Sequence, residues 1–280
     1  MTPPAALLLD LDGTLLDHDR AARIALAQAM QEAGLTDADH SSALLLWREL
    51  ERNHFQEYLD GQTTFEEQRV RRVGAFLAHY GRTRLDRTSA LAWFDTYRTA
   101  YEHAWRPYDD VMPFLQGLAD VRPRPAMAVV TNGDAEQQHA KLTAIGLSQL
   151  PLFASSSMGA RKPDPRVFHQ VCAALEVSPD AAWFIGDNLE VDARGASAAG
   201  LCGIWLNRDG STDQQAEPPR ASSLIEVLEW ARAGSDGACQ MVCVSRTERN
   251  GKNHDHDRRE EPRRALGPGP GRAAESLRAA

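Results

Sequence analysis

The sequence predicts an α/β protein: a three-layer α/β/α core around a mainly parallel sheet, with an all-helical cap inserted into it. Two observations predict this class. Short apolar runs of strand length alternate with helical patterns over much of the chain. One long stretch after the first apolar run contains helical patterns and no convincing strand.

The first predicted strand is residues 5–9, a continuous apolar run without polar alternation, which is typical of a strand buried on both faces. Similar runs follow at residues 126–130, 183–185 and 202–206, with a weaker one at 152–154. Helical patterns occupy residues 135–145, 165–175, 189–199 and 222–233. Strands that alternate with helices of this length indicate β–α units, and hence a Rossmann-like core.

The predicted cap covers residues 16–107. Its helical patterns lie at residues 20–33, 42–59, 65–79 and 89–104. We therefore expect the core to comprise residues 1–15 and 108–234. Residues 235–280 differ in composition, with many arginines, glutamates, prolines and glycines and few apolar residues, so we predict a disordered tail.

Charge and hydropathy restrict the partners. The formal net charge of −8 gives the chain no overall attraction for a phosphate backbone, so we expect no nucleic-acid partner. No apolar stretch reaches the length of a membrane span, and we find no leader segment at the N-terminus. We expect a cytoplasmic protein, monomeric or homodimeric, with no membrane partner.

Two carboxylates follow the first predicted strand. Asp10 and Asp12 lie on the same side of an extended chain, so both can face one small site at the sheet edge. One carboxylate can attack phosphorus while the other donates and accepts protons. A divalent ion would be needed to hold this negative cluster together with an anionic substrate. A turn or a helix cap would explain such a pair equally well if it stood alone.

Three later motifs each follow or adjoin a predicted strand. The hydroxyl of Thr131, the amide of Asn132 and the backbone beside Gly133 can bind phosphate oxygens. Lys162 can neutralise both the phosphate and the nucleophile, and Asp187 can complete the oxygen ligands of Mg²⁺. Each motif alone has an ordinary explanation as a turn, a surface lysine or a helix cap. Their shared position after strands favours one common site.

With these four motifs, the chain resembles the haloacid dehalogenase (HAD) superfamily, in the group whose helical cap follows the first strand. The resemblance covers about the first 234 residues. It rests on Asp10–Thr14 (DLDGT), Thr131–Gly133 (TNG), Lys162–Asp164 (KPD) and Gly186–Asp192 (GDNLEVD). These motifs are highly specific for the superfamily and carry little information about the substrate.

The resemblance implies a role for each motif residue. Asp10 would be the nucleophile that becomes phosphorylated, and Asp12 the acid and then the base. Thr131 and Lys162 would bind the phosphoryl group, with Asn132 as a further phosphate ligand. Mg²⁺ would be held by the side chains of Asp10 and Asp187 and by the backbone carbonyl of Asp12. The resemblance makes Asp192 a partner that supports these metal ligands.

The resemblance also separates the reactions within the superfamily. Haloacid dehalogenases generally lack the second aspartate, so Asp12 disfavours that reaction. Phosphonatases use a cap lysine, and residues 16–107 contain none. We therefore expect an Mg²⁺-dependent phosphoric monoester hydrolase acting on a small phosphorylated metabolite, a nucleotide or sugar phosphate, in a phosphatase or nucleotidase-like branch. The alternatives are a phosphomutase of the same superfamily and a non-catalytic module that binds phosphometabolites.

The cap normally sets substrate specificity in this family. His54, Arg69 and Arg72 are polar cap residues that we nominate as candidates to face the site. For each of them, an outward or cap-internal position is the more ordinary expectation for a polar helical residue.

Overall fold

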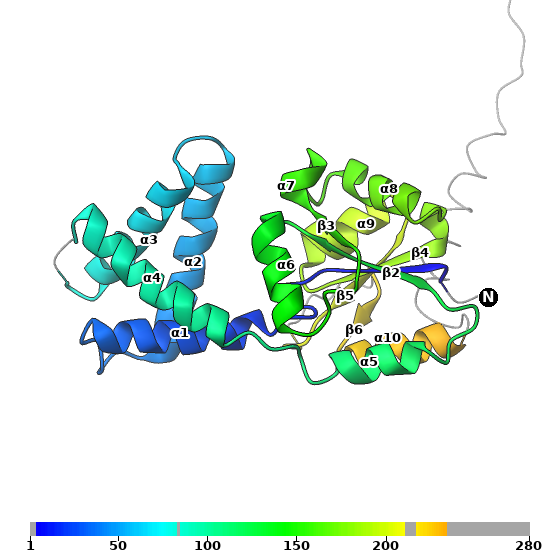
Figure 1. Cartoon of the computed structure of the whole chain (residues 1–280), viewed down its shortest axis with the longest axis horizontal. Helices are drawn as coiled ribbons and strands as arrows, with labels where there is room; N and C mark the ends of the chain where they lie inside the picture. Colours follow the sequence, from blue (N-terminus) through cyan, green and yellow to red (C-terminus); the bar gives the residue numbers. More distant parts are fainter. Residues whose placement is uncertain (1–3, 83–84, 211–216, 234–280) are drawn as a thin grey trace, which may run out of the picture. The chain divides into compact units, whose positions relative to one another are not determined.

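The core is built on one six-stranded sheet in which every pairing is parallel (Figure 1). The computed structural model describes residues 4–82, 85–210 and 217–233. In sheet order the strands are β3 (Leu152–Ala154), β2 (Ala126–Thr131), β1 (Ala6–Leu9), β4 (Ala182–Gly186), β5 (Cys202–Leu206) and β6 (Arg220–Ala221). The chain order reverses beside β1, and in such sheets ligands bind at the carboxyl ends of the strands there.

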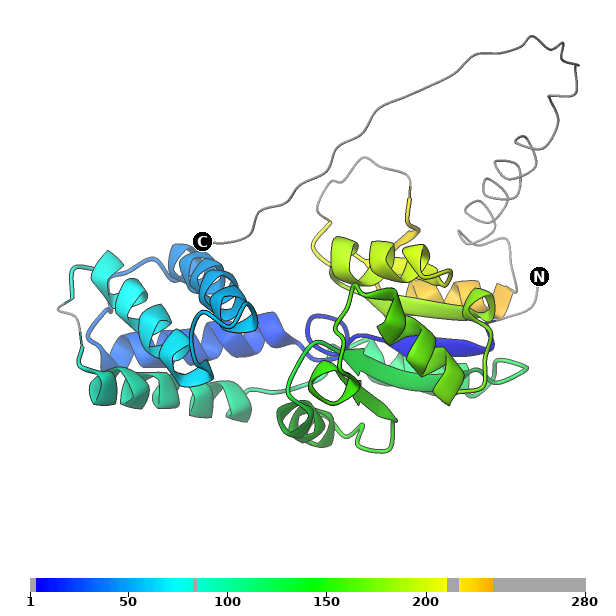
Figure 2. The same ribbon diagram turned by 90° about the horizontal axis from the view of Figure 1, so that it is seen from above.

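Helices cover both faces of this sheet, as the predicted three layers require (Figures 1 and 2). The core helices are α5 (Val111–Leu118), α6 (Ala135–Ala144), α7 (Ser155–Met158), α8 (Pro165–Ala174), α9 (Gly195–Ala198) and α10 (Leu224–Ala233). Side chains alternate along a strand, so β1 packs its side chains against the helices on both faces of the sheet. Leu7 and Leu9 pack with α5 and α10, whereas Leu8 packs with α8 and α9. All three leucines are fully buried, which explains the unbroken apolar run.

Between β1 and α5 the chain forms a segment of four helices: α1 (His18–Glu32), α2 (His40–Leu59), α3 (Phe65–His79) and α4 (Arg87–His103). This four-helix segment has an apolar cluster of its own. Trp47 lies within it and packs edge-on against Phe76 and Trp93, with ring centroids 5.3 and 5.4 Å away. The prediction of a helical insertion is confirmed, while its limits at residues 16 and 107 stay predictions.

The stretch of chain that leaves the core for the four-helix segment lies beside the stretch that returns from it. Leu16 and Pro107 form an antiparallel bridge. The amide of Asp17 donates to the Arg106 carbonyl at 3.0 Å, and the Tyr108 amide donates to the Leu15 carbonyl at 3.1 Å. These bonds hold the outgoing and returning chain together directly after Asp10 and Asp12.

Several elements differ from the sequence prediction. α1, α2 and α4 begin two residues earlier than expected, because Asp17, Asp39 and Asp86 cap them. The helix expected at residues 189–199 is divided into a π-helical turn at Leu189–Arg194 and the short α9. The elements α5, α7 and β6 were not predicted.

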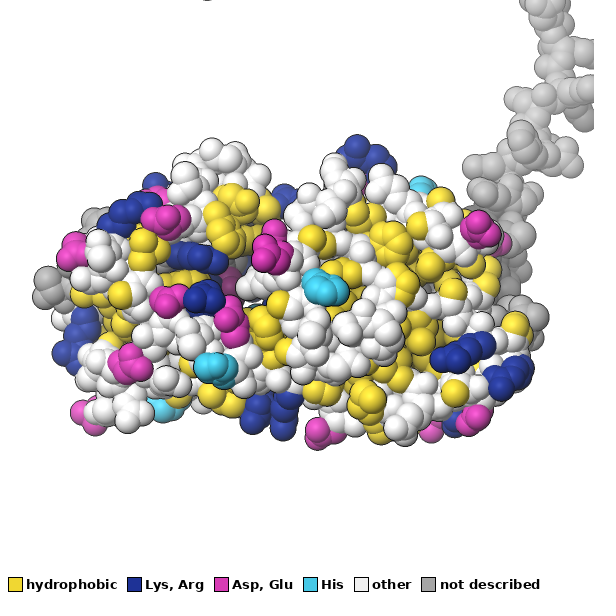
Figure 3. All heavy atoms as spheres, viewed as in Figure 1, with side chains coloured by type: hydrophobic (Ala, Val, Ile, Leu, Met, Phe, Trp, Pro, Cys, Tyr) yellow, Lys and Arg dark blue, Asp and Glu magenta, His cyan; other side chains and the backbone are white. Residues whose placement is uncertain are grey.

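No helix among the described residues is long and apolar enough to cross a membrane. On the face drawn in Figure 3, Lys and Arg side chains lie among Asp and Glu side chains. The predicted disordered tail, residues 235–280, lies outside the described residues.

Candidate active site

The sheet brings the predicted site residues to one edge. Asp10 directly follows β1, Thr131 ends β2, and Asp187 directly follows β4. Because these three strands are parallel neighbours, their carboxyl ends meet. The Asp10 amide continues the ladder by donating to the Ile185 carbonyl at 2.9 Å, which fixes the backbone at the start of the first motif.

Lys162 reaches from the loop before α8 into the centre of this edge. Its ammonium donates to Asp10 Oδ1 at 2.6 Å and to the Val130 carbonyl at 2.9 Å, and it pairs with Asp192 Oδ1 at 2.7 Å. The lysine is 3% exposed. Burial disfavours the charged form, but Asp10 and Asp192 outweigh it and raise the pKa of Lys162. The lysine ammonium predicted to lie beside Asp10 therefore contacts it directly.

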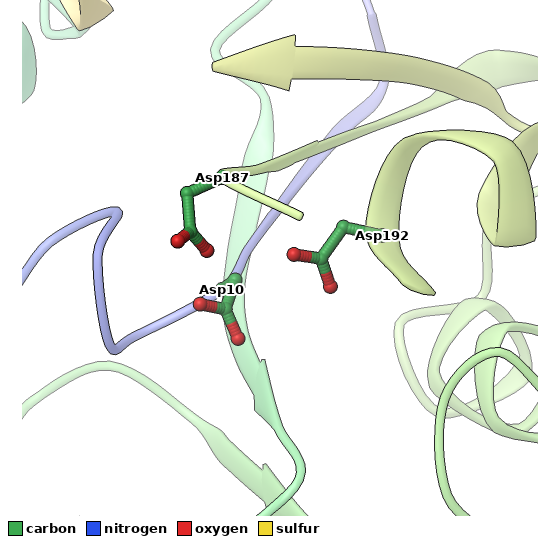
Figure 4. A group of neighbouring side chains, drawn as sticks. All are labelled: Asp10, Asp187 and Asp192. Carbon is green, nitrogen blue, oxygen red and sulfur yellow. The ribbon is translucent and has the colours of Figure 1, made fainter. Parts of the chain in front are cut away.

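Three carboxylates gather around Lys162. One carboxylate oxygen of each of Asp10, Asp187 and Asp192 lies within 4.8 Å of the others, and the three side chains lie close together (Figure 4). Burial raises the pKa of Asp10 to about 7, with Lys162 opposing the shift and Asp192 adding to it. Burial and the charge of Asp10 also raise the pKa of Asp187. A carboxylate cluster with a single ammonium attracts a divalent cation, and hard oxygen donors suit Mg²⁺.

The turn after Asp10 is shaped around the same cluster. Gly13 has φ +84°, a left-handed conformation that glycine adopts without strain. A Cβ atom at Gly13 would collide with the carboxylate of Asp187. The glycine of the first motif is thus needed twice, for the turn and for the close approach of Asp187.

Asp12 is held by side chains that the sequence analysis did not select. Lys141 Nζ donates to Asp12 Oδ1 and Oδ2 at 2.8 and 2.7 Å, and Gln138 Nε2 donates to Oδ2 at 3.0 Å. His18 Nδ1 lies 3.9 Å from Oδ1. Burial would raise the pKa of Asp12, but Lys141 and then His18 outweigh it and lower this pKa to about 2.

A signal for Gln138 and Lys141 was present in the sequence. They are three residues apart on the helix that follows the Thr131–Gly133 motif, so they share one face. Both are buried although they are polar. Burial is a tertiary property, so the sequence alone does not distinguish these two side chains from the exposed polar residues of the same helix.

Thr131 and Asn132 occupy different positions in the site. Thr131 Oγ1 accepts a hydrogen bond of 2.6 Å from Gln138 Nε2. The Asn132 side chain instead brackets the backbone of Lys162: its Nδ2 donates to the Lys162 carbonyl and its Oδ1 accepts from the Lys162 amide, both at 2.8 Å. Asn132 thus joins two motifs, and its predicted contact with phosphate stays a prediction.

The three cap candidates contact other residues of the four-helix segment. His54 pairs with Glu57 at 3.3 Å. The guanidinium of Arg69 lies over the Phe65 ring, 4.2 Å from its centroid. Arg72 lies 3.8 Å from the Trp47 ring centroid and pairs with Glu51 at 2.8 Å. These contacts agree with the cap-internal alternative.

Glu51 connects Arg72 electrostatically with the site. Burial would raise the pKa of Glu51, but Arg72, then His18 and Lys141, lower it. His18 Nδ1 also lies 2.7 Å from the Tyr101 hydroxyl. The helices α1, α2 and α4 thus bring polar groups toward Asp12.

Comparison with known proteins agrees with this geometry. The glyceraldehyde 3-phosphate phosphatase of Methanopyrus kandleri is 32% identical to this chain over 216 residues, which cover 75% of this chain and 87% of the relative. The ribulose-1,5-bisphosphate 5-phosphatase of Halopiger xanaduensis is 28% identical over 78% of this chain and 91% of its own length.

A solved structure shares the fold. The magnesium-bound HAD-hydrolase YfnB of Bacillus subtilis superposes with a TM-score of 0.67 at 23% identity, covering 82% of this chain and 99% of that protein. The haloacid dehalogenase-like hydrolase family model matches residues 4–200. With its four motifs gathered at one sheet edge, the chain belongs to the haloacid dehalogenase-like hydrolase family.

Proposed function

We propose that this hydrolase cleaves small phosphate monoesters in two steps, through a phosphorylated Asp10. The relatives named above act on glyceraldehyde 3-phosphate and ribulose 1,5-bisphosphate, which supports a small phosphorylated metabolite as the substrate. The observation that carries the mechanism is the buried contact of 2.6 Å between the Asp10 carboxylate and Lys162, among the other carboxylates at the strand ends.

In the first step, a carboxylate oxygen of Asp10 attacks phosphorus and the bond from phosphorus to the ester oxygen breaks. Asp12 is ionised in the protein alone, so it takes up a proton as the anionic substrate binds and then gives that proton to the leaving oxygen. In the second step, Asp12 takes a proton from water while the water oxygen attacks phosphorus. Inorganic phosphate leaves, and Asp10 returns to its initial state. Lys162 and the hydroxyl of Thr131 stabilise the charge on the transferring group.

Mg²⁺ fits the residues present. Asp10 and Asp187 supply side-chain oxygens, the carbonyl of Asp12 is the third proposed ligand, and Asp192 lies within the same cluster. Burial raises the pKa of Asp10 to about 7, and the charge of Lys162 does not cancel that shift. When bound, Mg²⁺ would neutralise part of this charge and that of the phosphate.

The test is release of inorganic phosphate from three-carbon and sugar phosphates, nucleotides and an aryl phosphate, with and without Mg²⁺. Asp10→Asn should lower kcat on the order of 10³-fold or more, because a nucleophile is lost. Asp120→Asn, which changes an exposed aspartate outside the site, is the matched control. Wild-type protein quenched in acid during turnover should carry phosphate on Asp10. An Asp10→Asn variant as active as wild type would refute the proposal.

A further inference from the structure

Two buried polar side chains of α6 contact Asp12 and have no role in the two steps above. Gln138 and Lys141 are 2% and 5% exposed. Together they direct three N–H groups at the carboxylate of one aspartate. We infer that Gln138 and Lys141 are positioning residues that hold the proton-transferring carboxylate of Asp12 against the phosphate-binding hydroxyl of Thr131. This inference rests on the proposed function.

Gln138 connects two motifs through a single amide nitrogen. Nε2 donates to Asp12 Oδ2 at 3.0 Å and to Thr131 Oγ1 at 2.6 Å, which uses both of its N–H groups. The reverse orientation of the amide would set a carbonyl oxygen against a carboxylate, so only the nitrogen can face Asp12. Because the Thr131 hydroxyl accepts from Gln138, its own hydrogen is free to donate to a phosphoryl oxygen.

Gly133 allows Gln138 to lie this close. A Cβ atom at Gly133 would stand 2.7 to 2.8 Å from three atoms of the Gln138 side chain. The glycine of the second motif therefore leaves space for the side chain of Gln138, in addition to its role in the turn after β2.

Lys141 fixes the plane of the Asp12 carboxylate. One ammonium bonds both oxygens, at 2.8 and 2.7 Å, and it lies 5.7 Å from the centroid of the Tyr101 ring. The Asp12 side chain is 30% exposed, so without these bonds it could rotate toward solvent. A general acid acts well only when its oxygen is held within hydrogen-bond reach of the leaving oxygen.

The inference predicts a dependence on the leaving group. An alkyl phosphate, such as glycerol phosphate, needs a proton on the leaving oxygen. A 2,4-dinitrophenyl phosphate does not, because its phenolate is a stable anion. Gln138→Leu and Lys141→Met should each lower kcat/KM for the alkyl ester about 10²-fold, the lower range for general acid catalysis. The kcat/KM for the dinitrophenyl ester should change less than about threefold, because kcat/KM reports the first step alone and that step then needs no acid.

Three variants complete the experiment. Asp12→Asn should show the same preference for the better leaving group, more strongly. Adding Lys141→Met to Asp12→Asn should cause no further loss, because residues that act through one another are not additive. Gln137→Leu, one position before Gln138 on α6 and with no contact to Asp12 among the described residues, is the matched control and should behave as wild type.

The outcomes separate this inference from the proposed function. Equal losses with both esters in folded Gln138→Leu, or no loss with either, would overturn the positioning role. If Lys141→Met does not fold, Gln138→Leu decides the question, since it removes no charge. An Asp12→Asn variant with unchanged rates on both esters would instead refute the proposed function.

Discussion

At the scale of single residues, the site depends on the balance between the buried ammonium of Lys162 and the carboxylates around it. Lys162 donates hydrogen bonds to Asp10 and to the Val130 carbonyl, and it forms an ion pair with Asp192. A buried ammonium is tolerated only when it is paired and hydrogen-bonded in this way. The sequence predicted the lysine and its contact with Asp10, because motifs after parallel strands converge. It did not predict that Asp192 also pairs with Lys162, because the position of Asp192 depends on the conformation of the turn between Asp187 and Asp192.

A prediction at this scale concerns Gly13. Gly13→Ala should cost about 1 to 2 kcal/mol in unfolding free energy from backbone strain, and it should also displace Asp187 and weaken binding of Mg²⁺. Gly146→Ala is the matched control, because Gly146 has φ +75° and open space around its Cβ position. Urea denaturation with calorimetric titration of Mg²⁺ would measure both effects. Equal metal affinity in the two variants would contradict the proposed crowding of Asp187.

At the scale of elements, the ends of helices were harder to predict than their existence. Apolar periodicity located α1 to α4, but α1, α2 and α4 each begin with polar residues that gave no periodic signal. β6 is two residues long and pairs with β5 through Trp205 and Leu206, so only tertiary contact defines it. In the π-helical turn, the Ala193 amide bonds the Asn188 carbonyl five residues back, a departure that side-chain spacing does not encode.

The start of α1 gives a prediction at the element scale. Asp17 accepts from the Arg20 amide at 3.1 Å as the N-cap and pairs with Arg106 at 3.2 Å. Asp17→Ala should therefore lower the unfolding free energy by about 1 to 2 kcal/mol. Arg106→Gln removes only the half-exposed ion pair and should cost less than about 1 kcal/mol.

Thr64→Ala, which removes the cap of α3 alone, calibrates the cost of a cap at about 1 kcal/mol. Chemical denaturation of the three variants would rank them. A larger loss in Arg106→Gln than in Asp17→Ala would show that the ion pair, and not the cap, stabilises this junction.

At the scale of the whole molecule, the parallel sheet and the helical insertion followed from the sequence because both leave long-range patterns in hydropathy. The position of Asp12 did not follow from the sequence, because its partners come from two separate regions: Lys141 and Gln138 on α6, and His18 at the start of α1. Only the folded chain brings these together. The same applies to the pairing of Arg72 with Glu51, while the place of Arg72 in the site stays a prediction.

A whole-molecule prediction links Mg²⁺ to stability. Burial raises the pKa of Asp10 from 3.8 to about 7, so the metal-free fold binds more protons than the unfolded chain between these values. Its stability should therefore fall as pH rises from about 4 to 7 and then level off. Mg²⁺ competes with these protons, so the increase in Tm on adding Mg²⁺ should be larger at pH 8 than at pH 5.5.

Thermal unfolding at both pH values, with and without Mg²⁺, would measure this linkage. Asp187→Asn removes one proposed ligand and should reduce the increase at pH 8. An increase in Tm that is equal at both pH values would contradict proton competition at the carboxylate cluster.

The paired ends of the four-helix segment bear on how proteins of this architecture can diversify. The Leu15 carbonyl and the Tyr108 amide already meet at 3.1 Å, so the chain enters and leaves the four-helix segment at one doubled crossing. Recombination between homologous genes at that crossing could exchange the whole four-helix segment without breaking a strand of the sheet. Selection could then vary that segment while Asp10, Asp12 and Asp187 stay unchanged.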